Sequence, residues 1–427
     1  MLNGAVSQAT ASDVNARIDA VWRIEAARVI SALGRIVGDL GLAEELAQDA
    51  LVAALEQWPS EGIPRNPGAW LMTTGKRRAI DRIRRDVTLR EKITIIGREL
   101  KDQEDPYDEV DERIDDAVGD DLLRLIFTAC HPVLGSDARV ALTLKAVGGM
   151  STAEIARAFL SSEATIAQRI VRAKKTLLTK QVGFEAPTPQ ELPERLPTVL
   201  SVIYLIFNEG YVASSGDDWL RPQLCHDALR VGRMLCGLLP EESEVFALTA
   251  LMELQASRIG ARTDRNGNAV LLLDQQRSRW DRLLISRGLR ALDRAHALGG
   301  ARGNYALQAA LAACHARAAR AEDTDWATIA AIYATLAEES PSPVVELNRA
   351  VAVGMAYGPQ AGLDLVDQLL DVPALQRYHL LPSVRGDLLA KLDRPEEAAA
   401  EFRRAADLAG NEQDRALLIK RAESAEA

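Results

Sequence analysis

Apolar residues recur at intervals of three and four along nearly the whole chain, and runs of β-branched residues are rare. Alanine and leucine, which favour helices, are abundant. This pattern predicts an all-α protein. Residues 269–273, AVLLL, read as a strand after a turn-like DRNGN, but we expect no sheet from one such run. Because 427 residues are too many for one compact core, we expect two to four domains.

Three breaks divide the chain. Residues 99–121 hold 12 acidic against 2 basic residues, and like charges keep a segment solvated. Residues 183–197 hold four prolines, which is typical of a stiff linker, and the glycine-rich residues 298–304 end a helical unit. We therefore predict a domain at 1–90, an acidic linker at 91–121, a domain at 122–182, a proline-rich linker at 183–197, a helical middle domain at 198–300 and helical repeats at 301–427.

The distribution of charge points to a polyanionic partner. The chain has a formal net charge of -10, yet six basic residues and one acid lie between Lys76 and Arg85. Residues 122–182 are also basic, with 9 Lys and Arg against 3 Asp and Glu. A phosphate-binding loop is excluded for the first cluster, because Trp70 and Arg77 stand where that motif requires Gly and Ser or Thr.

The first basic cluster is predicted to lie on a helix that starts near Pro67 and ends at about Asp86. Its buried side is expected to consist of Met72, Ala79, Ile80 and Ile83, and its exposed side of Arg77, Arg78, Arg82, Arg84 and Arg85. Five guanidinium groups on one face repel one another, so a nucleic acid is the economical explanation for them.

A helix-turn-helix is predicted at residues 151–178. Ser151 and Glu154 form a capping box, and Ser162 caps a second helix after a short break. The first helix is expected to bury Ile155, Ala156 and Phe159, and the second Ile166, Ile170, Ala173 and Leu177. The opposite face of the second helix carries Thr165, Gln168, Arg169, Arg172 and Lys175. Such side chains read base edges and hold phosphates, although an ordinary helical hairpin with a solvated charged face would look similar.

Two different DNA-facing helices on one flexible chain suit two separated DNA elements. In this order and spacing, residues 16–87 resemble the second conserved region of a bacterial sigma factor, and residues 122–180 resemble the fourth. The stretches AEELAQDALVAALEQWP, RNPGAWLMTTGKRRAIDRIRRD and the helix-turn-helix carry the resemblance. With no third region between them, the layout resembles the extracytoplasmic-function (ECF) class. The remainder looks like the large helical extension of one ECF subgroup.

The resemblance implies a role for each matching segment. The partners would be the RNA polymerase core, through its β′ clamp helices and β flap, and promoter DNA. It assigns three sets of residues: core binding to Glu45, Gln48, Asp49 and Glu56; recognition of the −10 element to Asn66, Arg77, Arg78, Arg82, Arg84 and Arg85; and recognition of the −35 element to Ser161, Ser162, Thr165, Gln168, Arg169, Arg172 and Lys175. In the family a base is flipped out of the stack at the −10 element, and Trp70 is expected in the core.

The last third contains a weak internal repeat. At an offset of 36, Pro359 meets Pro395 and Val366 meets Phe402. This indicates tetratricopeptide-like helix pairs, although any antiparallel helical array gives a similar spacing. Where a typical ECF factor is held by a separate anti-sigma protein, this chain carries a fused acidic extension. It either regulates the sigma part intramolecularly or offers a platform for a protein partner.

No catalytic, cofactor or metal site is expected, and the chain is predicted not to be an enzyme. Cys130, Cys225 and Cys314 each precede a histidine, but their wide spacing favours packing over zinc binding. No membrane span or secretory signal is expected, which indicates a cytoplasmic protein. The rival interpretations are a one-component helix-turn-helix regulator, a helical adaptor for RNA or acidic proteins, and an uncharacterised enzyme in residues 198–300.

Overall fold

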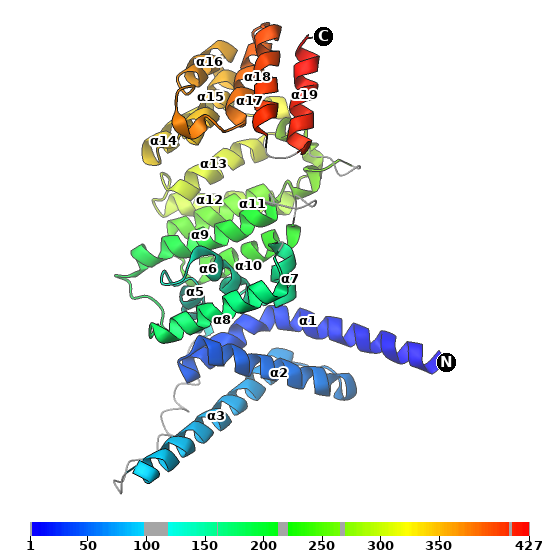
Figure 1. Cartoon of the computed structure of the whole chain (residues 1–427), viewed down its shortest axis with the longest axis vertical. Helices are drawn as coiled ribbons and strands as arrows, with labels where there is room; N and C mark the ends of the chain where they lie inside the picture. The colour runs from blue at the N-terminus through cyan, green and yellow to red at the C-terminus, as the bar shows by residue number, and fades with distance from the viewer. Residues whose placement is uncertain are drawn as a thin grey trace. The chain divides into compact units, whose positions relative to one another are not determined.

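The structure is a computed structural model that describes residues 2–97, 118–159, 161–211, 221–264, 270–409 and 412–426. These residues form helices without a β-sheet (Figure 1), as the sequence predicts. None of the described helices combines the length and apolarity that a membrane-crossing segment requires. The chain divides into two compact units, Met1–Pro240 and Glu241–Ala427.

The first unit begins with three long helices that pack against one another: α1 (Leu2–Val37), α2 (Leu40–Glu61) and α3 (Pro67–Gly97). The helices α5 (Val118–Ala129), α6 (Ser136–Ala146), α7 (Thr152–Ala158) and α8 (Glu163–Thr179) follow. The unit closes with α9 (Leu192–Tyr211) and α10 (Pro222–Leu238), which pack on α5 and α6. Most of the predicted acidic linker lies outside the described residues.

The second unit is a succession of helices that pack on their sequence neighbours. They are α11 (Ser243–Ala256), α12 (Arg282–Ala297), α13 (Asn304–Arg317), α14 (Trp326–Glu339), α15 (Pro343–Tyr357), α16 (Pro359–Asp367), α17 (Leu380–Lys391), α18 (Pro395–Leu408) and α19 (Glu412–Glu426). Short 3-10 turns lie at Ile259–Ala261, Leu272–Asp274, Arg277–Arg279, Ala321–Asp323 and Pro373–Leu375. Leu272 and Leu273, the end of the segment that reads as a strand, lie in one of these 3-10 turns, and Ala269 lies outside the described residues.

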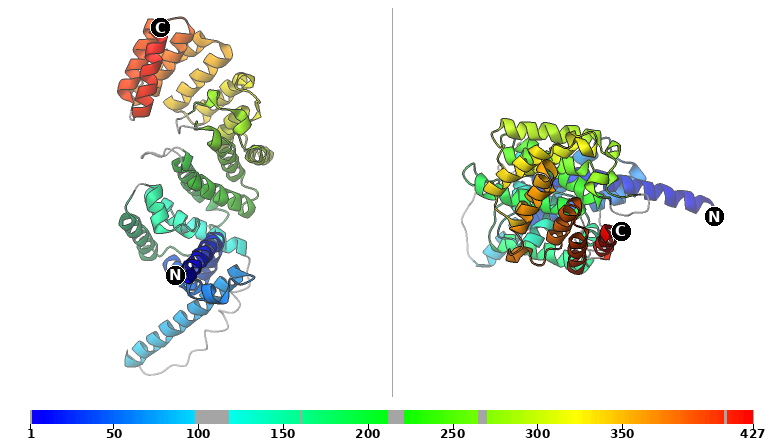
Figure 2. Two further views of the ribbon diagram at one scale, coloured as in Figure 1. Left: turned by 90° about the vertical axis from the view of Figure 1, so that its right-hand side faces the viewer. Right: turned by 90° about the horizontal axis from the view of Figure 1, so that it is seen from above.

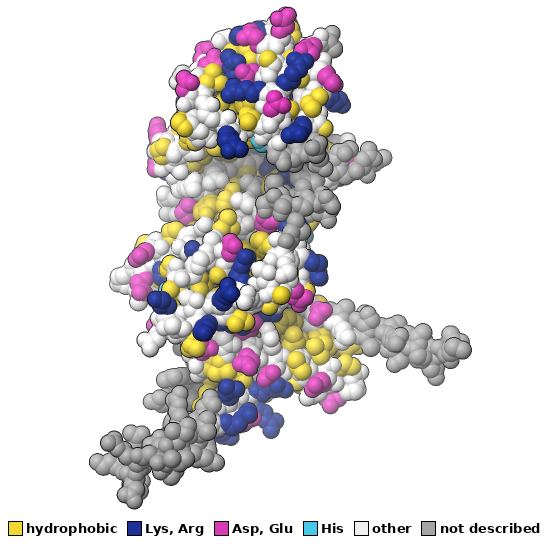
Figure 3. All heavy atoms as spheres, in the orientation of Figure 1, with side chains coloured by type: hydrophobic (Ala, Val, Ile, Leu, Met, Phe, Trp, Pro, Cys, Tyr) yellow, Lys and Arg dark blue, Asp and Glu magenta, His cyan; other side chains and the backbone are white. Residues whose placement is uncertain are grey.

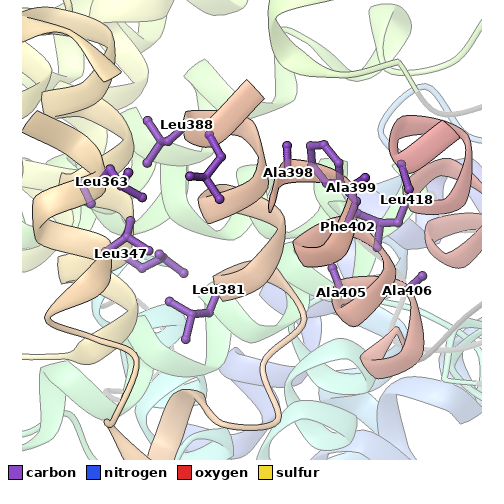
Figure 4. Close-up of a cluster of buried hydrophobic side chains, with 14 of the residues drawn as sticks. Leu347, Leu363, Leu381, Leu388, Ala398, Ala399, Phe402, Ala405, Ala406 and Leu418 are labelled. Atoms are coloured by element: carbon purple, nitrogen blue, oxygen red, sulfur yellow. The ribbon is translucent and has the colours of Figure 1, made fainter. Parts of the chain in front are cut away.

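The predicted repeat register is visible in the packing of the last helices. Pro359 and Pro395 each open a helix, and Val366 and Phe402 are both buried. Figure 2 shows α17, α18 and α19, orange to red, as adjacent helices. Their core combines large side chains with small ones (Figure 4) on Leu347, Leu363, Leu381, Leu388, Ala398, Ala399, Phe402, Ala405, Ala406 and Leu418. Small residues let helices approach closely, which is what stacked helix pairs require.

The division between the units falls at Pro240, inside the stretch predicted as one middle domain. In addition, α9 begins at Leu192, inside the predicted proline-rich linker, and contains Pro197. Phe184, at the start of that linker, is 7% exposed and lies against α1, where a Cβ on Gly34 would come 2.6 Å from its ring. The other predicted domain boundaries stay predictions.

Candidate nucleic-acid interface

Helix α3 presents the first basic cluster. Asn66 caps the helix, since its Oδ1 accepts a hydrogen bond from the Ala69 amide at 3.1 Å, and Pro67 suits the first position because it has no amide hydrogen. Leu71, Gly75 and Ala79 form its buried side, and the lack of a side chain at Gly75 makes room for Leu33 of α1. The expected buried side is therefore only partly right, because Ala79 is fully buried whereas the other three predicted side chains, Met72, Ile80 and Ile83, are half-buried.

The arginines of α3 lie on its outer side, where Figure 3 shows Lys and Arg side chains gathered over this helix. Arg77, Arg82, Arg84 and Arg85 are exposed, and Arg78 is half-buried. Arg78 lies 3.4 Å from Asp49 of α2, in a partly exposed ion pair of the kind that contributes little to stability. The arrangement gives a cationic face on a helix whose opposite side is anchored in the unit.

The helix-turn-helix has the predicted local structure. The Ser151 hydroxyl accepts a hydrogen bond from the Glu154 amide at 3.2 Å, and the Glu154 carboxylate accepts one from the Ser151 amide at 2.8 Å, which completes the capping box. Ser162 caps α8 by accepting from the Thr165 amide at 3.1 Å. The apolar face of α8 is buried as expected at Ile166, Ile170, Ala173 and Leu177. Phe159 ends half-buried at the turn.

The opposite face of α8 holds the candidate reading residues. Thr165, Gln168, Arg172 and Lys175 are exposed. Arg169 is half-buried and lies 3.3 Å from Asp137 of α6, while Ser161 is half-buried at the turn. Because the Ser162 hydroxyl already serves the helix cap, its contribution to binding a phosphate would compete with that cap.

Helix α2 presents the candidate polymerase-binding residues. Glu45, Asp49 and Glu56 are exposed, whereas Gln48 is half-buried and donates a 2.8 Å hydrogen bond to Glu44. Val52 and Leu55 are 49% and 39% exposed on the same helix. Figure 3 shows acidic and apolar side chains together over α2. Exposed apolar groups rimmed by charges are typical of a protein-binding surface.

Sequence reasoning missed the contacts that hold α1–α3 against α5–α8. Glu44 of α2 is 2% exposed and forms ion pairs with Lys174 of α8 and, at 4.0 Å, with Lys145 of α6. Burial lowers the pKa of Lys145; Glu44 opposes this and Lys174 adds to it. Two more ion pairs cross the same boundary, Arg35–Asp121 at 3.1 Å and Arg23–Glu154. Partners this far apart in sequence leave no periodic signal.

Helices α9 and α10 buttress the helix-turn-helix side of the first unit. Arg195 donates to the Phe127 carbonyl at 2.9 Å and Arg230 to the Gly148 carbonyl at 2.6 Å. Arg221 bonds both the Ala158 carbonyl and Glu209. Glu209 and Leu205 of α9, together with the candidate residues Ser161 and Arg169, line a hollow of about 420 Å³.

The cysteines of the three cysteine–histidine dipeptides lie in the protein interior. Cys130, Cys225 and Cys314 are buried, and Cys130 Sγ lies 3.3 Å from Thr143 Oγ1. Burial raises the pKa of the Cys130 thiol to about 11, so it stays protonated. Among the described residues, no cluster of His, Cys, Asp and Glu could hold a metal ion.

Three family models match successive parts of the chain. Residues 22–87 match Sigma-70 region 2, residues 124–177 match Sigma-70, region 4, and residues 195–296 match a family of unknown function, DUF6596. The two sigma matches cover α2, the basic part of α3 and the helix-turn-helix. The third match begins in α9 and ends in α12, and so crosses the division at Pro240.

Individual proteins are also similar to this chain. A Rhizobium meliloti (strain 1021) protein described as uncharacterized is 43% identical over 394 residues, which are 92% of each chain. A "Probable ECF RNA polymerase sigma factor SigI" of Mycobacterium tuberculosis is 29% identical over 178 residues, 40% of this chain and 58% of the relative. Yeast Tom70 aligns over 92% of this chain and 82% of its own with 12% identity and a TM-score of 0.30, which is too low to indicate a shared fold.

Proposed function

Because the chain belongs to the ECF-type RNA polymerase sigma factors and carries a C-terminal extension, we propose that it directs RNA polymerase core to promoters with −10 and −35 elements. The observation that carries the proposal is the presence of two different cationic helices, α3 and α8, in one chain and in the order of regions 2 and 4. In this proposal the chain is not an enzyme, and it acts in the cytoplasm by binding RNA polymerase and promoter DNA.

In this proposal α3 contacts and helps to open the −10 element, and α8 reads the −35 element. Gln168 and Arg172 are exposed on α8, and both residue types make bidentate contacts with base edges in the major groove. The α3 arginines bind phosphates, and this binding weakens as salt concentration rises. Helix α2 docks on the β′ clamp helices through Glu45, Asp49 and Glu56, with Val52 and Leu55 supplying apolar contact. Region 4 meets the β flap.

The packed first unit supports a regulatory role for its internal contacts. Elements named −10 and −35 are separated by about 85 Å along B-form DNA, at roughly 3.4 Å per base pair. Helices α2 and α8 are joined here through the Glu44–Lys174 ion pair. We therefore propose that the two regions separate when the polymerase binds, and that α9 and α10 influence this opening because they hold the helix-turn-helix side.

Run-off transcription from the DNA upstream of this chain's gene tests the main proposal. Purified bacterial core polymerase is used with the full chain, with the triple variant Arg78→Ala/Arg82→Ala/Arg85→Ala, and with the charge-matched control Arg282→Ala/Arg287→Ala/Arg290→Ala on α12. We expect a discrete transcript that needs the protein, disappears in the α3 variant and persists in the control. Sequence-specific duplex binding by the chain alone, without any polymerase-dependent transcript, would instead favour a one-component regulator.

A truncation series tests the regulatory part. A chain ending at residue 240 keeps α9 and α10, whereas one ending at 183 removes the helices that cover α5 and α6. If the second unit modulates activity, the transcript yield from residues 1–240 differs severalfold from that of the full chain. Equal yields from residues 1–240 and the full chain would show that the second unit does not regulate initiation, and would leave the sigma-factor proposal intact.

A further inference from the structure

A hollow of about 490 Å³ lies within the second unit, between α11, α13, α14 and α15. A volume of this size suits a small-molecule ligand. Its lining residues all belong to the second unit, whereas α2, α3 and α8 belong to the first. Among the described residues that line it, none is an Asp or Glu, although the chain as a whole is acidic.

The wall of this hollow is rich in neutral hydrogen-bonding groups. Amides come from Gln255, Asn304, Gln308 and Asn348, and hydroxyls from Tyr333, Ser340 and Ser342. Gln308 donates to Asn304 at 3.2 Å. Burial raises the pKa of Tyr333, so its hydroxyl keeps its proton and can donate. A ligand with several polar groups would find partners on four helices.

Arg258 brings a guanidinium group to one side of the hollow. Arg258 lines it and lies over the Trp280 ring at 5.9 Å, and Arg277 lies over the same ring at 5.0 Å. Arg277 is 5% exposed and donates to uncharged groups, the carbonyls of His315 and Ala318 and the Thr324 hydroxyl. Asp323 and Glu322 are the acids whose charge reaches Arg277. They do not line the hollow.

His315 lines the same side of the hollow, and the nearby arginines affect its pKa. Burial, together with Arg258 and Arg277, lowers the pKa of His315 to about 4, so the ring is neutral at physiological pH. Its Nδ1 is buried without a hydrogen-bond partner, and the ring packs edge-on to Trp326 at 5.4 Å. A neutral imidazole adds a hydrogen-bonding group to the wall without adding charge.

We propose that this hollow binds a small organic acid, with its carboxylate against Arg258 and its polar body against the amides and hydroxyls of α13, α14 and α15. A single lining guanidinium matches one carboxylate, because the two groups form paired hydrogen bonds in one plane. This site would give the second unit a chemical input that is independent of DNA.

Selective ¹⁵N-histidine labelling of the full chain tests the site, because the chain has only five histidines. The His315 imidazole signal is assigned with the His315→Gln variant. N-acetylglycine, which combines a carboxylate with an amide, is titrated against its neutral analogue N-acetylglycinamide and against inorganic phosphate, all at constant ionic strength. We expect a saturable shift of the His315 signal with N-acetylglycine and none with the neutral amide.

Variants decide whether the shift comes from the proposed contacts. Arg258→Gln should weaken N-acetylglycine binding at least tenfold, whereas Arg377→Gln, an exposed arginine outside the hollow, should leave it unchanged. If Arg258→Gln moves the other histidine signals and so disturbs the fold, Asn348→Leu at an exposed wall position replaces it. No saturable shift at 50 mM N-acetylglycine, equal binding of the neutral amide, binding of phosphate alone, or undiminished binding in the variant would each overturn the proposal.

Discussion

Lys174 of α8 is ion-paired with Glu44 of α2, a carboxylate that is 2% exposed. The pair joins α8, which we propose reads the −35 element, to α2, which we propose docks on the polymerase. A buried charge depends on its partner, because removal of one partner leaves the other desolvated and uncompensated. The stability of the first unit therefore depends on two residues that come from different sigma regions.

Lys174→Met should lower the free energy of unfolding by about 3 kcal/mol, because the buried Glu44 would lose one of its two lysine partners and the other, Lys145, lies 4.0 Å away. Urea unfolding at pH 7.5 measures the change, with Lys175→Met on the exposed face of α8 as the matched control. The double variant Glu44→Leu/Lys174→Met should recover most of the loss. If Lys174→Met were as stable as the control, the ion pair would not contribute to the stability of the first unit.

The effect of Gly34→Ala on the free energy of unfolding should depend on residue 184 and should reverse when Phe184 is removed. A Cβ at position 34 would come 2.6 Å from the Phe184 ring, so in the native chain we expect a loss of about 1–3 kcal/mol from overpacking. In a Phe184→Ala background the same change should stabilise α1 by about 0.5–1 kcal/mol, because alanine favours a helix more than glycine does. Urea unfolding of the four chains of this cycle measures both effects. Identical effects in the two backgrounds would mean that Phe184 does not pack there.

Substitutions of Arg169 and Asp137 should affect promoter binding differently. Arg169→Gln removes a candidate base contact on α8 and should weaken the polymerase–promoter complex by about 1–3 kcal/mol. Asp137→Asn removes an exposed acid 3.3 Å from Arg169 and should leave binding equal or tighter. Fluorescence anisotropy with a labelled promoter and core polymerase measures both variants. Weakening of similar size in the two would point to a structural role for the pair.

His315 should stay neutral throughout the physiological range. With a pKa of about 4, only about a tenth of it is protonated at pH 5, whereas an ordinary histidine with a pKa near 6.5 would be almost fully charged. Since the folded-state pKa is depressed, stability present above pH 6.5 is lost as pH falls toward 4. An NMR titration from pH 7.5 to 5 tests this, because the native His315 signal should shift little over that range, and Arg258→Gln should raise the pKa of His315. Titration of native His315 between pH 6 and 7 would contradict this account.

Features encoded by neighbouring residues could be predicted from the sequence. The capping box of Ser151 and Glu154 and the apolar face of α8 follow from spacings of three and four. The sequence analysis predicts the end of α3 at about Asp86, where the cluster of basic residues ends, and this prediction is wrong. The helix continues to Gly97, the first glycine or proline after Gly75.

Features that depend on distant residues could not be predicted in this way. Glu44 looks like any acid on an amphipathic helix until Lys174 lies beside it. Phe184 looks like a linker residue until it packs against α1. The hollow beside Arg258 combines side chains from α11, α13, α14 and α15, so no short sequence motif predicts it. The binding roles assigned to α2, α3 and α8 stay predictions, and the experiments above test them.

The placement of α9 and α10 in the first unit has a practical consequence for protein engineering. A designer who wishes to exchange the extension between relatives would naturally cut after the proline-rich segment, and would then strip two covering helices from the donor's helix-turn-helix. A junction after Pro240 instead keeps each of the two compact units in one piece. Chimeras joined there are the ones we expect to remain soluble.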